Sequence, residues 1–253
     1  MNDMNSVNQG QIVFPDAQTP DHSQAQAALQ ALANADKAAF LAGYFKTGPG
    51  QYGEGDCFLG VVVPDVRQMA KRFRRLSLPE CQRLLDSPHN EARLLALLIL
   101  VGHFERGESL IRSRIYDLYL TCRHRVNNWN LVDSSAPAIV GGHLRLRDRA
   151  VLDDLARSGV LWDRRIAVLA TLAFVRAGDF ADTLRLCTLL LNEPHDLIHK
   201  ACGWMLREVG HRDAAVLTDF VRSYQTQMPR TMLRYAIERM PPERRRLALA
   251  GEL

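Results

Sequence analysis

The sequence has few cysteines and no long apolar segment, and each shortage argues against a class of protein. The five cysteines are widely scattered and form no C-x-x-C pair, which argues against a zinc site or a redox motif. We interpret them as reduced residues that pack in the interior: Cys57, Cys81, Cys122, Cys187 and Cys202. The longest apolar run, residues 94–101, is too short to span a membrane, and the N-terminus lacks the pattern of a signal peptide. We therefore expect a cytoplasmic protein without a metal or cofactor.

What the sequence does contain is enough apolar material for a large core and a slight excess of positive charge. Its 253 residues are 47% hydrophobic, which allows one large domain or two small ones. The formal net charge is +4, and arginine far outnumbers lysine. Because the planar guanidinium group suits bidentate contacts to phosphate, the arginine content is more informative than the net charge.

The N-terminal part divides into a polar tail, two short helices and a glycine-rich loop. Residues 1–22 are rich in Asn, Gln, Asp and Pro and predict a mobile tail without chemistry. Helices are expected at residues 23–34 and 36–46. Residues 48–60 contain five glycines in thirteen positions, but no Lys-Ser or Lys-Thr pair follows and no strand precedes them. We therefore interpret them as a loop and not as a nucleotide site.

A basic segment follows this loop. Pro64 and Asp65 suit the first turn of a helix, and Arg67, Lys71, Arg72, Arg74 and Arg75 come after them. Two interpretations remain open for these cations, a solvated helix face or a contact with a polyanion.

The chain beyond residue 76 predicts helices almost throughout, and the pattern repeats. When the anchor residues Arg93, Trp129, Arg165 and Lys200 are aligned, their separations are 36, 36 and 35 residues. An apolar helix begins near each anchor, and a shorter amphipathic helix precedes it. Helix pairs with this period are typical of an α-solenoid. We therefore predict an all-α fold, a single curved domain of HEAT-like repeats over residues 23–253.

The segment from Asn127 to Pro137, N-N-W-N-L-V-D-S-S-A-P, interrupts the repeat. Its asparagines suit a helix cap, and its proline falls where the body of the helix is expected. Trp129 and Asp133 are four residues apart, so they share one helix face. The positions four residues beyond the anchors are Leu97, Asp133, Leu169 and Trp204.

A carboxylate at a position otherwise held by leucine or tryptophan needs an explanation. One interpretation is that Asp133 is a satisfied polar residue bonded to a neighbouring amide or arginine. The other is a ligand site, because stacked solenoid helices place Trp129 beside Arg165 and Asp133 close to Trp204. A patch with one acid, arginine and two large aromatic faces is more readily explained by a ligand than by core packing.

Several segments together resemble a known family. N-N-W-N-L-V-D at residues 127–133, L-W-D-R-R-I-A at 161–167 and K-A-C-G-W-M-L-R-E at 200–208 are similar to the three site segments of the AlkD-type DNA alkylation repair glycosylases. Residues 44–67 resemble the N-terminal segment of these proteins. The resemblance covers the chain from about residue 40 to about residue 210, and the segments occur in the same order at compatible spacing.

The resemblance implies a HEAT-like fold with a basic concave groove that binds duplex DNA containing alkylated bases. The implied reaction is excision of cationic N3- and N7-alkylated purines by a monomer. Asp133 would be the catalytic carboxylate, Trp129 and Trp204 the aromatic walls and Arg165 the clamp for a phosphate. Tyr44 matches a further aromatic residue of the family.

One position departs from the family pattern. Asn130 stands where the family commonly has an acid, which removes a negative charge next to the predicted site. Two other functions remain open on the sequence alone. One is a non-catalytic HEAT-like scaffold. The other is a family member that binds branched or distorted DNA, for which the cations of residues 67–75 matter more than Asp133.

Overall fold

The computed structural model describes residues 20–253, and residues 1–19 of the predicted tail lie outside them. The first helix, α1 (His22–Gln30), begins one residue before the expected start at Ser23. Its cap explains the position, since the Asp21 carboxylate accepts a hydrogen bond of 2.9 Å from the backbone N–H of Gln24. Residues 48–60 form a loop, as predicted, and the next helix begins at Val63 with Pro64 in its first turn.

Within residues 20–253 the structure is helical and contains no strand, which confirms the predicted all-α class. The elements that follow α1 are α2 (Ala35–Tyr44), α3 (Val63–Arg72), α4 (Leu78–Leu85), α5 (Asn90–Arg106), α6 (Ser109–Thr121), the 3₁₀ turn η1 (Arg123–Arg125), α7 (Trp129–Ala136), the π-helical turn η2 (Pro137–Gly141), α8 (Gly142–Leu144), α9 (Val151–Ala156), α10 (Leu161–Ala170), α11 (Leu172–Arg176), α12 (Ala181–Leu189), α13 (Asp196–Arg212), α14 (Ala214–Tyr224), α15 (Arg230–Ala236) and α16 (Pro242–Ala250).

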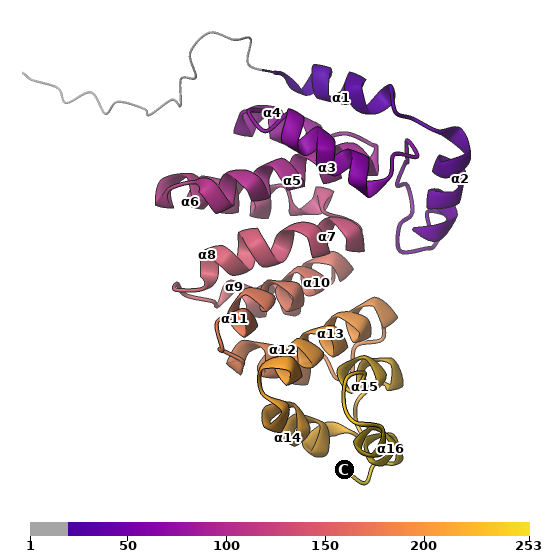
Figure 1. The fold of residues 1–253 in the computed structure, drawn as a ribbon, viewed down its shortest axis with the longest axis vertical. Helices are drawn as coiled ribbons and strands as arrows, with labels where there is room; N and C mark the ends of the chain where they lie inside the picture. The colour runs from indigo at the N-terminus through magenta and orange to yellow at the C-terminus, as the bar shows by residue number, and fades with distance from the viewer. Residues whose placement is uncertain (1–19) are drawn as a thin grey trace, which may run out of the picture.

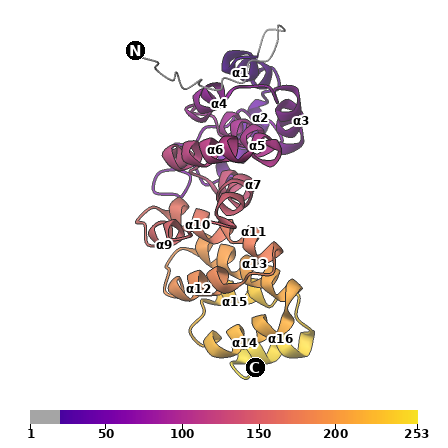
Figure 2. The same cartoon turned by 90° about the vertical axis from the view of Figure 1, so that its left-hand side faces the viewer.

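The helices are stacked along the long axis of the molecule, from α1 at one end to α16 at the other (Figure 1). The second view shows the same order and a body that is narrow compared with its length (Figure 2). Helix α7 packs against α5 and α10, α10 packs against α13, and α13 packs against α15. These four helix contacts place residues that are far apart in the sequence on one surface, as an α-solenoid requires. Their assignment to the HEAT-like class stays a prediction.

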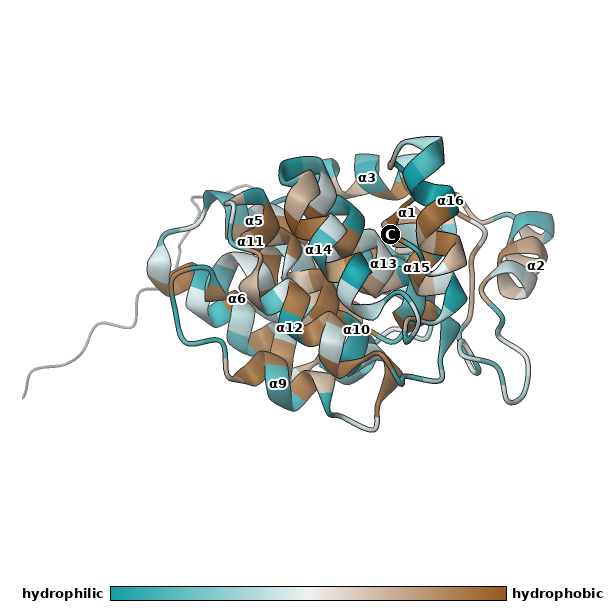
Figure 3. Ribbon diagram, turned by 90° about the horizontal axis from the view of Figure 1, so that it is seen from below, coloured by the Kyte–Doolittle hydropathy of each residue, from teal (hydrophilic) through white to brown (hydrophobic). Residues whose placement is uncertain are grey.

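The core runs continuously through this stack because most helices bury only one face. Figure 3 shows hydrophobic and hydrophilic residues on the same ribbons, the pattern of amphipathic helices. Helices α5 and α10 are exceptions, since neighbours cover them on several sides. In α5, Leu94, Leu95, Leu97 and Leu100 are all buried. Each buried leucine contributes roughly 1.5–3 kcal/mol to folding. Among residues 20–253, no helix combines the length and the apolar character that crossing a membrane requires.

The cysteines are free thiols, and four of them match the interpretation as packing residues. Cys81, Cys122, Cys187 and Cys202 are buried, and burial raises the pKa of the Cys81 thiol to about 12. Cys57 is exposed, so the interpretation is wrong for this residue. The reason is that Cys57 belongs to the loop before α3 and pairs through its backbone with His89, while its side chain packs in no helix interface.

Candidate active site

Helix α7 begins at Trp129 because Asn128 caps it. The Asn128 side-chain oxygen accepts a hydrogen bond of 2.9 Å from the backbone N–H of Trp129, and Asn128 itself has an extended backbone. The predicted cap is therefore confirmed at the second of the two asparagines. Since Asp133 lies four residues further on, its side chain and that of Trp129 project from the same face of α7.

The helix changes its geometry one turn after Asp133. Pro137 ends α7 and begins the π-helical turn η2. Proline has no backbone N–H, so the carbonyl of Asp133, four residues earlier, cannot receive the hydrogen bond that a regular α-helix would give it. π-Helical turns inside helices occur frequently at functional sites. The irregular backbone thus lies one turn after Asp133.

A glycine in this turn allows the next helix to approach. A Cβ atom built on Gly141 would lie 2.1 Å from the carbonyl oxygen of Ala170 at the end of α10, so any side chain here would collide with backbone. The close packing of η2 against α10 holds α7 and α10 side by side. This brings side chains of the two helices within hydrogen-bonding distance.

Asp133 of α7 and Arg165 of α10 form a bidentate ion pair. Arg165 donates from Nε to Asp133 Oδ1 and from Nη2 to Asp133 Oδ2, both at 2.8 Å. Its Nη1 donates to the carbonyl of Leu197 at 2.5 Å, which ties the pair to α13. The Asp133 side chain is 19% exposed and that of Arg165 only 6%. Burial raises the pKa of Asp133 above its ordinary value, while the hydrogen bonds and charge of Arg165 act in the opposite direction.

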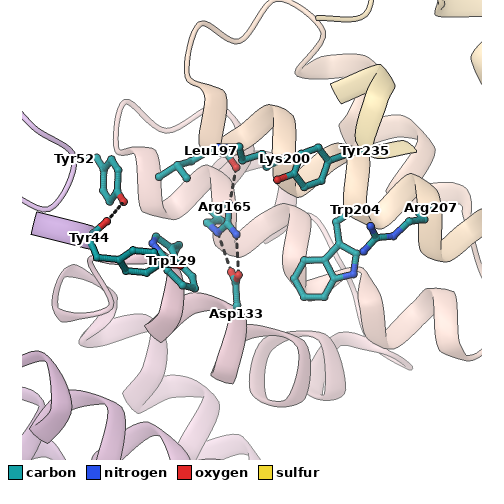
Figure 4. A pocket seen from close by; sticks show the side chains of 10 residues that line it. All are labelled: Tyr44, Tyr52, Trp129, Asp133, Arg165, Leu197, Lys200, Trp204, Arg207 and Tyr235. Carbon is teal, nitrogen blue, oxygen red and sulfur yellow. Dashed lines mark hydrogen bonds and ion pairs between the residues drawn. The ribbon is translucent and has the colours of Figure 1, made fainter. Parts of the chain in front are cut away.

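The Asp133 carboxylate faces a cavity of about 420 Å³, a size typical of ligand sites. All five predicted site residues line it, although they come from four different helices: Tyr44, Trp129, Asp133, Arg165 and Trp204. Figure 4 shows Asp133 and Arg165 in the middle of this group, with the two indole rings on either side. The structure therefore brings the predicted residues together, and their individual roles stay predictions.

The aromatic walls differ in how they are held. Trp129 stacks on Phe45 with ring centroids 5.0 Å apart, and Tyr44 meets Trp129 edge-on at 6.0 Å. Tyr44 is 55% exposed, so much of its ring remains free for a ligand. Trp204 donates from its indole nitrogen to Glu208 at 3.0 Å, which fixes the ring one turn before that glutamate on α13.

Five cavity residues were not predicted as site residues, and they are Tyr52, Leu197, Lys200, Arg207 and Tyr235. Lys200 and Arg207 belong to the same face of α13 as Trp204. The helical spacing from Trp204 could therefore have predicted that both residues line the site. Lys200 pairs with Asp196 at 2.7 Å, and Arg207 pairs with Glu238. Tyr52 comes from the glycine-rich loop and donates its hydroxyl to the Tyr44 carbonyl at 3.4 Å.

A buried carboxylate fixes the glycine-rich loop against the site helices. Asp56 accepts hydrogen bonds from the side-chain amides of Asn90 at 2.8 Å and Asn128 at 3.0 Å, and it forms an ion pair with Arg93. The Asp56 side chain has no exposed surface. Because Asn128 also caps α7, this one carboxylate connects the loop to the helix that carries Trp129 and Asp133.

The end of the same loop is held by a second carboxylate. Glu91, in the first turn of α5, accepts hydrogen bonds from the successive backbone N–H groups of Leu59, Gly60 and Val61 at 3.0, 2.9 and 3.3 Å. Three backbone donors that converge on one buried acid leave the chain little freedom there. The loop that carries Tyr52 is therefore fixed at its C-terminal end.

Asn130, which replaces the acid common in the resembling family, turns away from the cavity. Its amide nitrogen donates to Asn90 Oδ1 at 2.7 Å, and the Asn90 amide returns a contact of 3.4 Å to Asn130 Oδ1. Asn130 is not among the cavity residues. Within the described chain, no group of three or more histidine, cysteine or carboxylate side chains could hold a metal ion.

Replacing Asp56 by asparagine should lower the free energy of unfolding by about 3 kcal/mol, because the Arg93 guanidinium would remain buried without a counterion. Urea denaturation followed by circular dichroism measures the change. Asp219→Asn is the matched control, since its ion pair with Arg222 is exposed, and its midpoint should not move. Equal midpoints for the two variants would contradict the role given to Asp56.

Most of the chain matches the model of a known protein family. A family model described as "DNA alkylation repair enzyme" matches residues 25–240. The chain belongs to the DNA alkylation repair enzyme family. All the cavity residues lie inside the matched range. The resemblance found in the sequence motifs is thereby confirmed, and family membership places the protein among enzymes of DNA alkylation repair.

A solved structure supports the fold of this DNA alkylation repair family member. The structure titled "Predicted DNA alkylation repair enzyme from Enterococcus faecalis" is similar with a TM-score of 0.63, over 83% of this chain and 97% of that chain. The two sequences are 15% identical, so the match concerns the fold. No curated protein matched the sequence.

Proposed function

We propose that the protein is a DNA glycosylase that hydrolyses the N-glycosidic bond of N3- and N7-alkylated purines in duplex DNA. The observation that carries the proposal is the Asp133 carboxylate, held in a fixed orientation by Arg165 at the wall of a cavity with aromatic sides. Family membership supports alkylated DNA as the substrate. A protein that served only as a scaffold would have no need for a carboxylate between two indoles.

The proposed reaction needs no acid to protonate the base, because an N-alkylated purine already carries a positive charge. When the glycosidic bond breaks, its electron pair neutralises the departing base and leaves an oxocarbenium-like sugar. A carboxylate fixed beside this sugar stabilises the developing positive charge. Water then adds to the anomeric carbon, and its proton leaves to the carboxylate or to solvent. In this proposal Asp133 acts in both steps.

The aromatic residues would stabilise the same sugar cation. The faces of Trp129 and Trp204 attract positive charge through their π systems, and a sugar between them would lie close to Asp133. The exposed ring of Tyr44 extends the wall beside Trp129. An open cavity of this kind accepts a nucleotide without requiring a deep pocket for the base.

Arg165 acts in this proposal mainly through Asp133. Its guanidinium group has five N–H donors, and three of them are directed to Asp133 and the Leu197 carbonyl. The phosphate contact predicted for Arg165 would use the remaining two. Lys200 and Arg207, the other cations of the cavity, are the further candidates for phosphates next to the lesion.

DNA binding would extend beyond this cavity along a basic groove on a HEAT-like solenoid. The five cations that follow Pro64 support this part of the proposal, since all of them are exposed on α3 and the turn after it: Arg67, Lys71, Arg72, Arg74 and Arg75. Exposed arginine and lysine residues of this density suit the phosphate backbone of a duplex. They would set the affinity for DNA, whereas Asp133 would set the rate of excision.

The direct test is release of modified bases from duplex DNA that has been treated with a methylating agent. Chromatography of the supernatant should detect 7-methylguanine and 3-methyladenine in amounts that increase with time and enzyme. A duplex that contains uracil, a neutral base, should not release it, because the proposed site offers no group to protonate the leaving base. Binding of methylated DNA without release of either base would contradict the proposal.

The rate of excision should fall as the pH decreases through the raised pKa of Asp133. Only the ionised carboxylate stabilises a cation, and burial places its pKa above the ordinary value of 3.8. The acid limb of the pH–rate profile should therefore lie above that value, after correction for spontaneous base loss in the same buffers. Asp133→Asn should show a residual rate without this limb. An acid limb of the same shape in both proteins would assign it to another group.

A further inference from the structure

A second cavity lies at the C-terminal end of the stack. It measures about 110 Å³ and is enclosed by residues of α13, α14 and the segment from α15 to α16. The lining residues include four basic side chains and no carboxylate, and the basic ones are Arg207, His211, Arg239 and Arg244. A cavity with several cations and no acid is suited to an anion.

The first and second cavities are connected by one face of α13. Lys200 and Trp204 line the first cavity, His211 lines the second, and Arg207 lines both. These four residues follow the spacing that repeats on one side of a helix. The face of α13 that carries the candidate site therefore continues directly into the second cavity.

Some basic groups of the second cavity lack a hydrogen-bond or ion-pair partner within residues 20–253. The Nε atom of Arg207 is buried without a hydrogen-bond partner. Arg244 donates from Nη1 to the hydroxyl of Thr218 at 3.3 Å, a neutral partner. The ion pairs found in residues 20–253 include none for Arg239 or Arg244, although Glu238 pairs with Arg207 and Glu208 lies 3.4 Å from His211. The cavity therefore has a surplus of positive charge.

We propose that the second cavity binds a phosphate of the DNA backbone, two or three nucleotides from the base that is excised. The proposal rests on the proposed function in duplex DNA. From Trp204 to His211 the helix rises about 10 Å. The phosphates of one strand advance about 3.4 Å along the duplex axis at each step, so for a strand that runs along α13 this rise corresponds to about three steps. The second contact would fix the register of the strand relative to Asp133.

The test uses defined duplexes that contain one 7-methylguanine and are shortened stepwise from either end. Wild-type affinity should fall by about tenfold when the phosphate that occupies the second cavity is removed. The variant with both Arg239→Gln and Arg244→Gln should bind the long duplex about tenfold more weakly than wild type. Its affinity should not fall further when that phosphate is removed. A neutral methylphosphonate at the same linkage should weaken binding to wild type and leave binding to the double variant unchanged.

Arg245→Gln is the matched control, because this exposed arginine is on α16 next to Arg244 and does not line the cavity. It should lower affinity slightly at every duplex length and keep the tenfold fall in affinity when the phosphate in the second cavity is removed. A double variant that behaves like Arg245→Gln would overturn the proposal. Base release is scored separately in each complex. A fall in affinity at that duplex length without release of the modified base would contradict the glycosylase function and leave the phosphate site standing.

Discussion

Replacing Asp133 by asparagine should reduce the single-turnover rate of base excision by about two to three powers of ten, the range typical for loss of one preorganised electrostatic group. Asparagine has nearly the same shape, so the fold should persist, but it carries no charge to stabilise the sugar cation. Affinity for DNA should be retained or slightly increased, because the ground-state sugar is neutral and a negative charge beside the phosphates is removed. Rate, affinity and urea midpoint are measured on one preparation of the purified variant.

The matched control is Asp163→Asn. Asp163 is also a buried carboxylate paired with an arginine, Arg123, at 3.3 Å, but it does not line the cavity. Its loss should change the urea midpoint and leave the excision rate per folded molecule unaltered. If Asp133→Asn gives this same result, Asp133 is a structural residue and its proposed catalytic role is wrong.

Replacing Arg165 by alanine should lower the excision rate by about two powers of ten. The carboxylate of Asp133 would lose both hydrogen bonds that orient it, and a misplaced catalytic group loses most of its effect. The variant would also remove the charge that opposes the effect of burial, so the pKa of Asp133 should rise further. The acid limb of the pH–rate profile should therefore move to higher pH than in wild type.

Two comparisons separate this effect from simple loss of an ion pair. Arg164→Ala removes a neighbouring arginine of α10 whose partner is Glu193 at 2.9 Å, outside the cavity, and should leave the acid limb in place. The double variant of Asp133→Asn and Arg165→Ala should be no slower than Asp133→Asn alone, since Arg165 acts through the carboxylate. Additive losses would show that Arg165 contributes independently, as a phosphate clamp would.

The sequence indicated the site helices correctly but not their register. Alignment on the anchors placed Trp129 at the level of Arg165. In the structure α7 begins at Trp129, whereas α10 begins at Leu161, before its anchor. Counted from these starts, Asp133 and Arg165 are both fifth residues, and Lys200 is the fifth residue of α13. The Asp133–Arg165 pair follows from this shift of one turn, which the cap at Asn128 determines.

Other parts of the cavity could not be predicted from a helical period. Tyr52 belongs to the glycine-rich loop, whose path depends on Asp56 and Glu91 and therefore on contacts with distant helices. Tyr235 comes from α15, which lies beyond the last aligned repeat. Its approach to the cavity depends on Gly203, where a Cβ atom would lie 2.5 Å from the Cβ atom of Tyr235. Close packing of this kind is visible only in three dimensions.

The most direct test of the central claim is a single-turnover reaction on a duplex with one labelled 7-methylguanine, with enzyme in excess. The wild-type protein should yield free 7-methylguanine and an abasic site in equal amounts, and Asp133→Asn should yield almost none in the same time at the same fraction of bound DNA. Fully bound duplex that retains its modified base in the wild-type reaction would contradict the claim that this site breaks the glycosidic bond.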